Sequence, residues 1–301
     1  MPIQHILTHQ VLEQWHGRTV RDVLTQELGM ARQVLTRLKR SGSVLKNGLP
    51  CYVRDTVAQG DLLTIVLREE LEQEIGPEDI PIAVVYEDEH LLVVNKPAGL
   101  VVHPTKGYMS GTLANAIINH WSRQGNPYVF RPVHRLDRDT SGLVVVAKNP
   151  YIQETLTAQH HTREWTKKYL CLVTGRVTGS HGRIEAPIAR VGNGSRARII
   201  TTEGKTALTF WELLEPFNDA SLVRAELVTG RTHQIRVHLA HIGHPLIGDD
   251  VYGKPSPLIT RQALHAAEIC FTHPIIKSTI HLSCPLPEDM LALQQHLRLL
   301  P

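Results

Sequence analysis

A cluster of charged residues directly before an apolar run is where the chain first suggests chemistry. Residues 134–142 read HRLDRDTSG, and residues 143–147 read LVVVA, a run that predicts a buried strand. Charges at the start of a buried strand cost free energy unless they form ion pairs or serve a functional site. The cluster therefore predicts a loop that presents one carboxylate from a rigid platform. A surface turn with mutually screening charges is the simpler alternative.

The two aspartates of this cluster, Asp137 and Asp139, leave phosphoryl transfer open as a second alternative. They superficially resemble the paired aspartates of haloacid-dehalogenase-type phosphatases, a motif that follows an apolar strand. Here the apolar strand comes after the aspartates, and Thr140 stands one position too early. A single catalytic aspartate is the better interpretation.

A second dense cluster, residues 229–249, reads TGRTHQIRVHLAHIGHPLIGD. Its apolar residues predict a helix that ends near Gly243, with Ile235 and Leu239 on one face. Arg236 follows Ile235 by about 100° around the helix axis, so it can be half buried and still point into a cleft. The five histidines between positions 233 and 265 do not have the spacing of a helical zinc pair, and no glutamate is placed as in HExxH. We predict no bound metal.

The chain as a whole has the composition of an ordinary globular protein. It has 301 residues, of which 42% are hydrophobic and 20% charged. Its four cysteines are scattered without a CxxC pair, which fits reduced thiols. The first residues do not read as a signal peptide, and no run approaches the ~20 apolar residues of a membrane span. We expect a cytoplasmic protein that does not enter a membrane.

Charge is unevenly distributed along the chain. The net charge is +3, yet residues 69–90 carry nine acidic side chains and no basic one. The segments on either side are basic, which is compatible with a polyanionic partner. Because the acidic stretch would repel phosphates, we expect residues 69–80 to link a domain at 1–68 to a domain at 81–301.

The N-terminal segment predicts a small α+β module. Helices are expected near residues 20–28 and 31–40, and a strand over residues 62–66. Residues 42–48 read GSVLKNG, in which Asn-Gly predicts a hairpin turn. This phrase resembles the S4 RNA-binding domain, and an oligomerisation or packing module is an equal alternative. Salt-sensitive phosphate contacts of low sequence specificity would then come from Arg32, Arg37, Lys39, Arg40 and Lys46.

Two residues further along the chain are candidates for RNA contacts. Lys96, in a loop with proline and glycine, can meet a phosphate, or it can be a solvated lysine in a turn. Tyr169, at the start of a strand, can lie in the core, or its ring can stack on a base.

The sequence after residue 80 predicts strands at 83–86, 91–94, 143–147, 169–173, 207–213, 221–227 and 279–283, and helices at 112–120, 235–242 and 288–299.

An ordered series of motifs resembles the RluA-type pseudouridine synthases. Their signature is similar to HRLDRDTSG at residues 134–142. The resemblance extends over about residues 80–300, with an S4-like module in front as many members have. The other motifs that carry it lie at residues 95–99, 167–169, 230–236, 243–249, 264–266 and 272–274.

The resemblance implies an enzyme that isomerises uridine to pseudouridine in RNA. The N1–C1′ bond breaks, the uracil turns and C5 bonds to C1′, which needs no cofactor. Asp137 matches the nucleophile or base at the sugar, and Arg236 matches its basic partner. Tyr169 matches the ring stacked on the uracil, which could also help to remove the C5 proton. Arg135 matches the arginine that fills the space left by the flipped base. Further RNA contacts are expected from His134, Lys96 and Arg231.

Elementary energetics agrees with these roles. Taking a base out of its stack costs a few kcal/mol, and an aromatic platform returns ~1–3 kcal/mol. A dry pocket disfavours a charged carboxylate, whereas an adjacent guanidinium, which keeps its proton, favours it.

The expected fold class is α+β, with an S4-like module followed by a catalytic domain on a mixed, mainly antiparallel sheet with flanking helices. We expect a monomer that acts on structured large-subunit ribosomal RNA, with transfer RNA as the alternative substrate. A non-catalytic RNA-binding or ribosome-assembly factor is the rival from another class of proteins.

Overall fold

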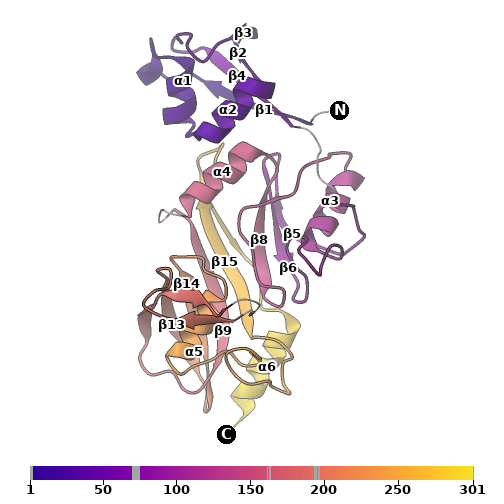
Figure 1. Ribbon diagram of the computed structural model, residues 1–301, viewed down its shortest axis with the longest axis vertical. Coiled ribbons are helices and arrows are strands. Elements are labelled where there is room, and N and C mark those ends of the chain that lie inside the picture. Colours follow the sequence, from indigo (N-terminus) through magenta and orange to yellow (C-terminus); the bar gives the residue numbers. More distant parts are fainter. Residues whose placement is uncertain are drawn as a thin grey trace.

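The structure, a computed structural model, describes residues 3–69, 75–160, 162, 164–192, 195 and 197–300. Its strands form a four-stranded sheet, a ten-stranded sheet and a two-stranded ribbon. The four-stranded sheet and its helices lie at one end of an elongated molecule, and the large sheet runs through the rest (Figure 1). Within the described ranges, every helix is too short or too polar to span a lipid bilayer.

The N-terminal part is built on the four-stranded antiparallel sheet, in the order β1-β4-β2-β3. Asn47 and Gly48 have φ values of 52° and 82°, as the two-residue hairpin turn requires, so the predicted hairpin is confirmed. The first predicted helix is α-helical only at its start and continues as a π-helical turn, Val23–Glu27. The elements are β1 (Ile3–Gln10), a 3-10 turn (Glu13–Trp15), α1 (Val20–Asp22), α2 (Arg32–Ser41), β2 (Ser43–Lys46), β3 (Leu49–Cys51) and β4 (Leu62–Glu69).

Strand β1 was not predicted from the sequence. Its buried positions include His5 beside Leu7, and histidine is no strong strand former. Pairing with β4 over its full length, and not local preference, makes this segment a strand.

The large sheet follows the order β10-β13-β14-β9-β15-β8-β6-β5, with β16 beside β15 and β7 beside β8. Of its pairings only β8 with β15 is parallel, so the predicted α+β class with a mixed, mainly antiparallel sheet is confirmed. The elements are β5 (Ala83–Glu87), β6 (Leu91–Lys96), α3 (Leu113–Arg123), β7 (Arg131–Pro132), β8 (Ser141–Ala147), α4 (Pro150–Gln159), β9 (Thr166–Thr174), β10 (His181–Glu185), β11 (Ile188–Arg190), β12 (Arg198–Ile200), β13 (Leu208–Pro216), β14 (Ala220–Leu227), α5 (Gln234–His241), β15 (Leu264–Thr272), β16 (Thr279–Ser283) and α6 (Glu288–Leu299).

Helices cover both faces of the large sheet, so its central strands are apolar on both sides. In β6, Leu92 and Val94 join the core that includes residues of α3 and α5, whereas Leu91 and Val93 join the core that includes α4. This alternation follows from the two-residue period of a strand. Helix α6 packs on a third cluster, with Met290, Leu293 and Leu297 buried. The candidate site lies on the face of α3 and α5.

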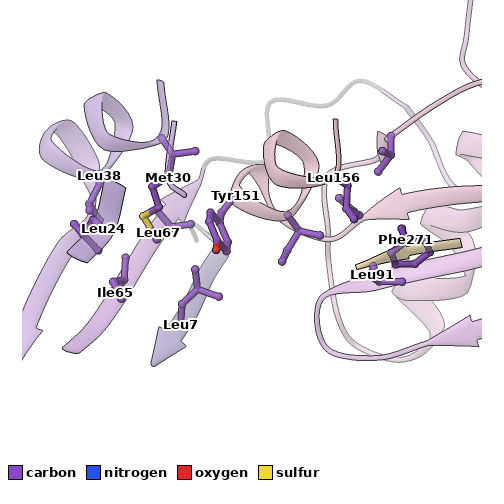
Figure 2. Close-up of a cluster of buried hydrophobic side chains, with 14 of the residues drawn as sticks. Leu7, Leu24, Met30, Leu38, Ile65, Leu67, Leu91, Tyr151, Leu156 and Phe271 are labelled. Carbon is purple, nitrogen blue, oxygen red and sulfur yellow. The ribbon is translucent and has the colours of Figure 1, made fainter. Parts of the chain in front are cut away.

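One buried cluster continues from the N-terminal part into the large domain (Figure 2). Tyr151 of α4 is fully buried at the junction, and its hydroxyl donates to the Leu28 carbonyl at 2.6 Å. Glu69, the last residue of β4, forms ion pairs with Arg131 and with Arg37 of α2. These contacts fix the N-terminal part against the large domain.

The predicted acidic linker is not a free connector where the structure describes it. The Asn115 side chain of α3 donates to the Gly76 carbonyl at 2.9 Å, and the Gly111 amide donates to Glu78 at 3.1 Å. Asp79 pairs with Arg123 at 2.8 Å. Residues 75–79 therefore lie along α3 because its polar groups hold them, and residues 70–74 of the expected linker lie outside the described residues.

Candidate active site

The charged cluster forms a loop that enters β8, as the apolar run predicted. Gly142, at the start of β8, pairs in parallel with Ala266 of β15 and has a φ of 114°. A Cβ atom at this position would lie 2.3 Å from the Ala266 carbonyl oxygen, so no other residue fits without a backbone shift. The close approach of β15 therefore anchors the loop that carries Asp137.

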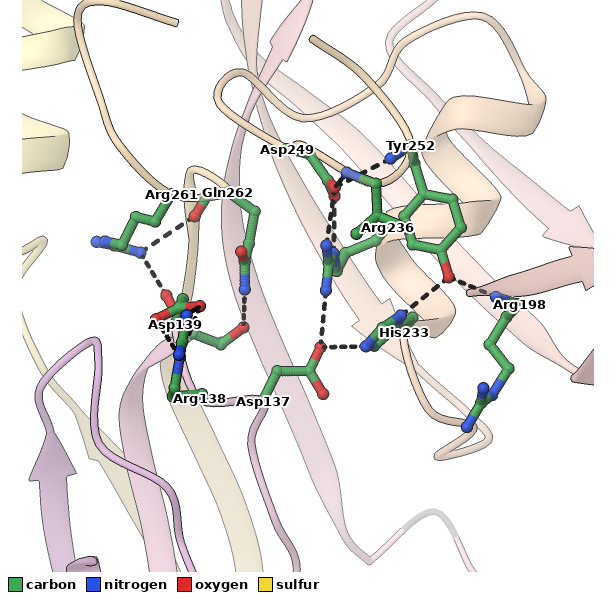
Figure 3. Close-up of polar contacts among 12 residues, drawn as sticks. Asp137, Arg138, Asp139, Arg198, His233, Arg236, Asp249, Tyr252, Arg261 and Gln262 are labelled. Carbon is green, nitrogen blue, oxygen red and sulfur yellow. Dashed lines mark hydrogen bonds and ion pairs between the residues drawn. The ribbon is translucent and has the colours of Figure 1, made fainter. Parts of the chain in front are cut away.

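The residues after Asp137 support the loop. Arg261 donates to the Asp139 carbonyl at 3.1 Å, and Gln262 donates to the Thr140 hydroxyl at 3.2 Å (Figure 3). The Asp139 carboxylate accepts hydrogen bonds from Arg138, its neighbour. Asp139 thus has a supporting place in the loop.

The prediction that Lys96 contacts an RNA phosphate is corrected by the structure. Lys96 is fully buried and cannot meet a phosphate. Its ammonium donates to the carbonyls of Pro97 at 2.8 Å, Leu100 at 2.9 Å and Arg138 at 2.9 Å. Burial lowers its pKa to about 7. It is neither an RNA contact nor a solvated lysine, but a bridge between its own loop and the loop of Asp137.

Asp137 lies between two nitrogen-bearing side chains (Figure 3). Its Oδ2 is 3.5 Å from Arg236 Nη1 and 3.6 Å from His233 Nε2, and its side chain keeps 27% of its surface exposed. The structure thus brings Asp137 and Arg236 together, although they lie far apart in the sequence.

Arg236 is held from behind by Asp249. Its Nε and Nη2 donate to the two Asp249 oxygens at 2.7 and 2.8 Å, and the Tyr252 ring lies 5.2 Å from its guanidinium carbon. Burial opposes a charge on Asp249, but the hydrogen bonds and charge of Arg236 hold the pKa of this carboxyl below its ordinary value. Arg236 is therefore buried in a fixed orientation, not half buried as expected.

His233 begins α5 in the left-handed conformation, with a φ of 58°. The Arg198 amide donates to the Tyr252 hydroxyl at 2.7 Å, and this hydroxyl lies 2.9 Å from His233 Nδ1. Burial lowers the pKa of His233, so the ring is neutral at neutral pH. We assign the hydroxyl proton of Tyr252 to Nδ1 from this network, which leaves the N–H on Nε2, facing Asp137.

Tyr169 of β9 lines a cavity of about 250 Å³ together with Asp137 and Arg236. Burial, followed by the charge of Asp137, raises the pKa of its hydroxyl, so the phenol stays protonated at neutral pH. Asp137, His233 and Arg236 also line a wider adjoining cleft of about 780 Å³. The basic side chains of Lys106, Arg138, Arg190 and Arg198 lie along that cleft. Asp137 therefore stands where a small pocket opens into a basic groove.

Comparison with known proteins agrees with this geometry. The profile of the RNA pseudouridylate synthase family matches residues 90–241. A Bacillus subtilis protein named "Uncharacterized RNA pseudouridine synthase YlyB" is 39% identical over 290 residues, which cover 95% of this chain and 96% of that protein. The chain belongs to the RNA pseudouridine synthase family. It is an enzyme of a class of isomerases that act on uridine in RNA.

Two further relatives extend the comparison. The "Ribosomal large subunit pseudouridine synthase D" of Pseudomonas aeruginosa is 41% identical over 273 residues, or 86% of this chain and 85% of that protein. The solved structure of "Human RNA Pseudouridylate Synthase Domain Containing 1" is similar with a TM-score of 0.57 and 28% identity, and covers 74% of this chain and 97% of that chain. The resemblance inferred from the motifs is confirmed.

The other predicted RNA contacts of this pseudouridine synthase have different surroundings. Arg135 is exposed and lines both the cavity and the cleft. Arg231 is exposed at the cavity and donates to the Thr206 carbonyl at 3.1 Å. His134 lines the cavity, but burial lowers its pKa far below the ordinary value. A neutral His134 cannot act as a cation toward phosphates.

The basic residues of the N-terminal part also divide into two groups. On α2, Arg32, Lys39 and Arg40 are exposed. Arg37 pairs with Glu69 at 3.4 Å, although its side chain remains 42% exposed. The Lys46 ammonium donates to the Thr56 carbonyl at 3.0 Å and remains partly accessible. Arg37 as a phosphate contact stays a prediction, with Glu69 as a competing partner.

Sequence reasoning missed His233, Asp249 and Tyr252 as individual residues, although the first two lie in motifs that it singled out. Asp249 could have been predicted from the sequence as the partner of a cation. It follows an apolar stretch, and a carboxylate that is buried there must be paired. Two other histidines of this region form hydrogen bonds. His238 bonds with the Thr209 hydroxyl at 2.9 Å, and His244 with the Thr174 carbonyl at 3.0 Å.

Proposed function

We propose that this enzyme converts uridine to pseudouridine in structured large-subunit ribosomal RNA, with Asp137 acting at the sugar. The observation that carries the proposal is the position of this single carboxylate where a small cavity opens into a basic cleft. A flipped uridine would place its base in the cavity and its phosphates in the cleft. The printed name of the Pseudomonas aeruginosa relative supports the choice of ribosomal RNA over transfer RNA.

The geometry supports a division of roles among the residues around Asp137. The carboxylate attacks C1′ or acts there as a base, while Arg236 and the N–H of His233 keep it oriented. The Tyr169 ring serves as the platform for the uracil. Burial raises the pKa of its hydroxyl, which favours the neutral phenol over a phenolate in the unliganded site. Arg135, exposed at the entrance, fills the space that the base vacates.

We further propose that residues 1–68 form an S4-like RNA anchor, followed by the catalytic domain, in a cytoplasmic monomer. The exposed face of α2, with Arg32, Lys39 and Arg40, suits phosphates. The buried contact of Tyr151 with Leu28 would keep a constant separation between this face and Asp137. A fixed separation would select uridines at a set distance from the RNA segment that the anchor binds.

Pseudouridine mapping in ribosomal and transfer RNA tests the function. Cells that lack the protein should lose one or more pseudouridines in large-subunit ribosomal RNA. Wild type and Asp139→Asn should restore them, whereas Asp137→Asn should not, although it keeps its fold and its RNA binding. Restoration by Asp137→Asn would remove the role of the carboxylate. A loss confined to transfer RNA would replace the proposed substrate.

A further inference from the structure

The active-site cavity contains a lysine to which none of the roles above applies. Lys167 and Tyr169 are two positions apart on β9, so their side chains leave the same face of the strand, and both line the cavity. Lys168, between them, points to the opposite face and pairs with Glu268 at 3.6 Å. The strand thus directs one lysine toward the pocket and the next one away from it.

Within the described part of the chain, Lys167 has no carboxylate partner. Burial alone lowers its pKa to about 8, and no opposing charge offsets that effect. Asp137 lines the same cavity but is matched by Arg236 and His233. Lys167 is half-buried in the cavity wall, and a partly desolvated cation without a counter-ion favours an anionic ligand in that cavity.

A second polar group of the same cavity, a ring nitrogen of His134, also lacks a partner among the described residues. His134 Nδ1 is buried and has no hydrogen-bond partner among the described residues, while its Nε2 accepts from the Val145 amide at 3.3 Å. The charge of Lys167 contributes to the lowered pKa of His134, after burial, so the two groups lie near each other. The wall that they form, together with the Tyr169 ring, offers hydrogen-bonding groups to one edge of a flat ring.

We propose that Lys167 is a catalytic residue that binds a carbonyl oxygen of the target uracil and stabilises the negative charge on the departing base. This inference rests on the proposed function. When the N1–C1′ bond breaks, its electron pair leaves with the base and gives a uracil anion. C5 then bonds to C1′, C5 loses its proton and N1 gains one, so the product is an isomer. Lys167 keeps its proton throughout and acts only through its charge.

A phosphate fits this position less well than a base does. Phosphates remain in the open cleft, where Arg138 and Arg190 lie, whereas Lys167 lines the smaller cavity beside Tyr169. The titratable groups that line the cavity with Lys167 are His134, Arg135, Asp137, His160, Tyr169, Arg231, His233 and Arg236. Among the residues that the structure describes, Asp137 is the one carboxylate of the cavity lining.

The test compares neighbouring lysines in the full-length enzyme. Release of tritium from a large-subunit ribosomal RNA transcript labelled at C5 of uridine gives the single-turnover rate. Lys167→Met should lower this rate about 100-fold, as loss of one group aimed at a developing charge does, and change RNA affinity less than twofold. Lys168→Met, the matched control, should stay near the wild-type rate. Lys167→Arg should recover at least a tenth of the wild-type rate.

The pH profile separates catalysis from packing. The wild-type rate should fall above about pH 8, where Lys167 loses its proton, and Lys167→Arg should shift this fall to higher pH because a guanidinium stays charged. A Lys167→Met rate within threefold of wild type would overturn the inference, as would a folded Lys167→Arg variant with an unshifted profile. A wild-type enzyme that releases no tritium would instead remove the proposed function, and this inference with it.

Discussion

Arg236 donates through its Nε and Nη2 to Asp249, at 2.7 and 2.8 Å. Its Nη1 is thereby left to face Asp137 at 3.5 Å. One guanidinium thus connects two carboxylates, a fully buried one that fixes its orientation and a partly exposed one that can react. An arginine in this position cannot leave Asp137 to follow a phosphate of the substrate. This arrangement sets the first expectation.

Asp249→Asn should lower both stability and activity. The variant leaves a buried guanidinium with one carboxylate fewer, so the free energy of unfolding should fall by about 3 kcal/mol. The rate of pseudouridine formation should fall at least tenfold, because Arg236 can then turn away from Asp137. Asp250→Asn is the matched control, since its carboxylate is mostly exposed and lies 4.0 Å from Arg236. Equal effects of the two substitutions in urea denaturation and rate assays would contradict this expectation.

Tyr252→Phe should affect activity mainly through His233, although it also removes the acceptor of the Arg198 amide. The phenylalanine keeps a ring against Arg236 but removes the hydroxyl that bonds to His233 Nδ1. Loss of one hydrogen bond of about 1 kcal/mol should lower the rate roughly fivefold. Tyr252→Ala, which also removes the ring, should lower the rate further. If single-turnover assays show the same rate for Tyr252→Phe and wild type, the assigned orientation of His233 has no role in the reaction.

RNA binding should depend on the exposed face of α2. Replacing Arg32, Lys39 and Arg40 by Gln should weaken binding and reduce the slope of log K against log[salt] by about 2 to 3, since each phosphate contact contributes roughly 0.7 to 0.9. Arg37→Gln should leave the slope nearly unchanged, because Arg37 already pairs with Glu69. Filter binding over a salt titration measures both variants. A larger loss of RNA affinity and salt slope for Arg37→Gln than for the triple variant would place the RNA on another face.

Stability should decrease in mild acid because of buried neutral histidines. Burial lowers the pKa of His265 from 6.5 to about 4. Between these two pH values the unfolded chain binds a proton at this histidine, whereas the folded chain does not. Its contribution to stability is full above pH 6.5 and is lost as the pH falls from 6.5 toward 4, by about 2–3 kcal/mol at pH 4.5. In His265→Gln, the difference in unfolding free energy between pH 7 and pH 4.5 should shrink by that amount. An unchanged difference in urea titrations would assign the acid sensitivity to other groups.

Local patterns in the sequence determined most elements of this fold and the candidates for its chemistry. Apolar runs and their periods predicted β8, β9, β14, α5 and α6, because burial on one face or two leaves a regular trace in the chain. The Asn-Gly pair predicted its hairpin because the required φ values suit these residues. The placement of Asp137 before a buried strand and of Arg236 on a helix also followed from local spacing.

Which charged groups meet was decided only by the tertiary structure. Lys96 looks like a solvent-exposed cation in the sequence, yet it is fully buried among backbone carbonyls, and the partly exposed Arg37 pairs with Glu69. The parallel pairing of β8 with β15 joins residues that lie far apart in the chain and fixes the loop of Asp137. Local periodicity shows that a position is buried, but a buried charge is matched by whichever partner the packing of distant elements brings to it. Asp249 and Arg236 became partners in that way.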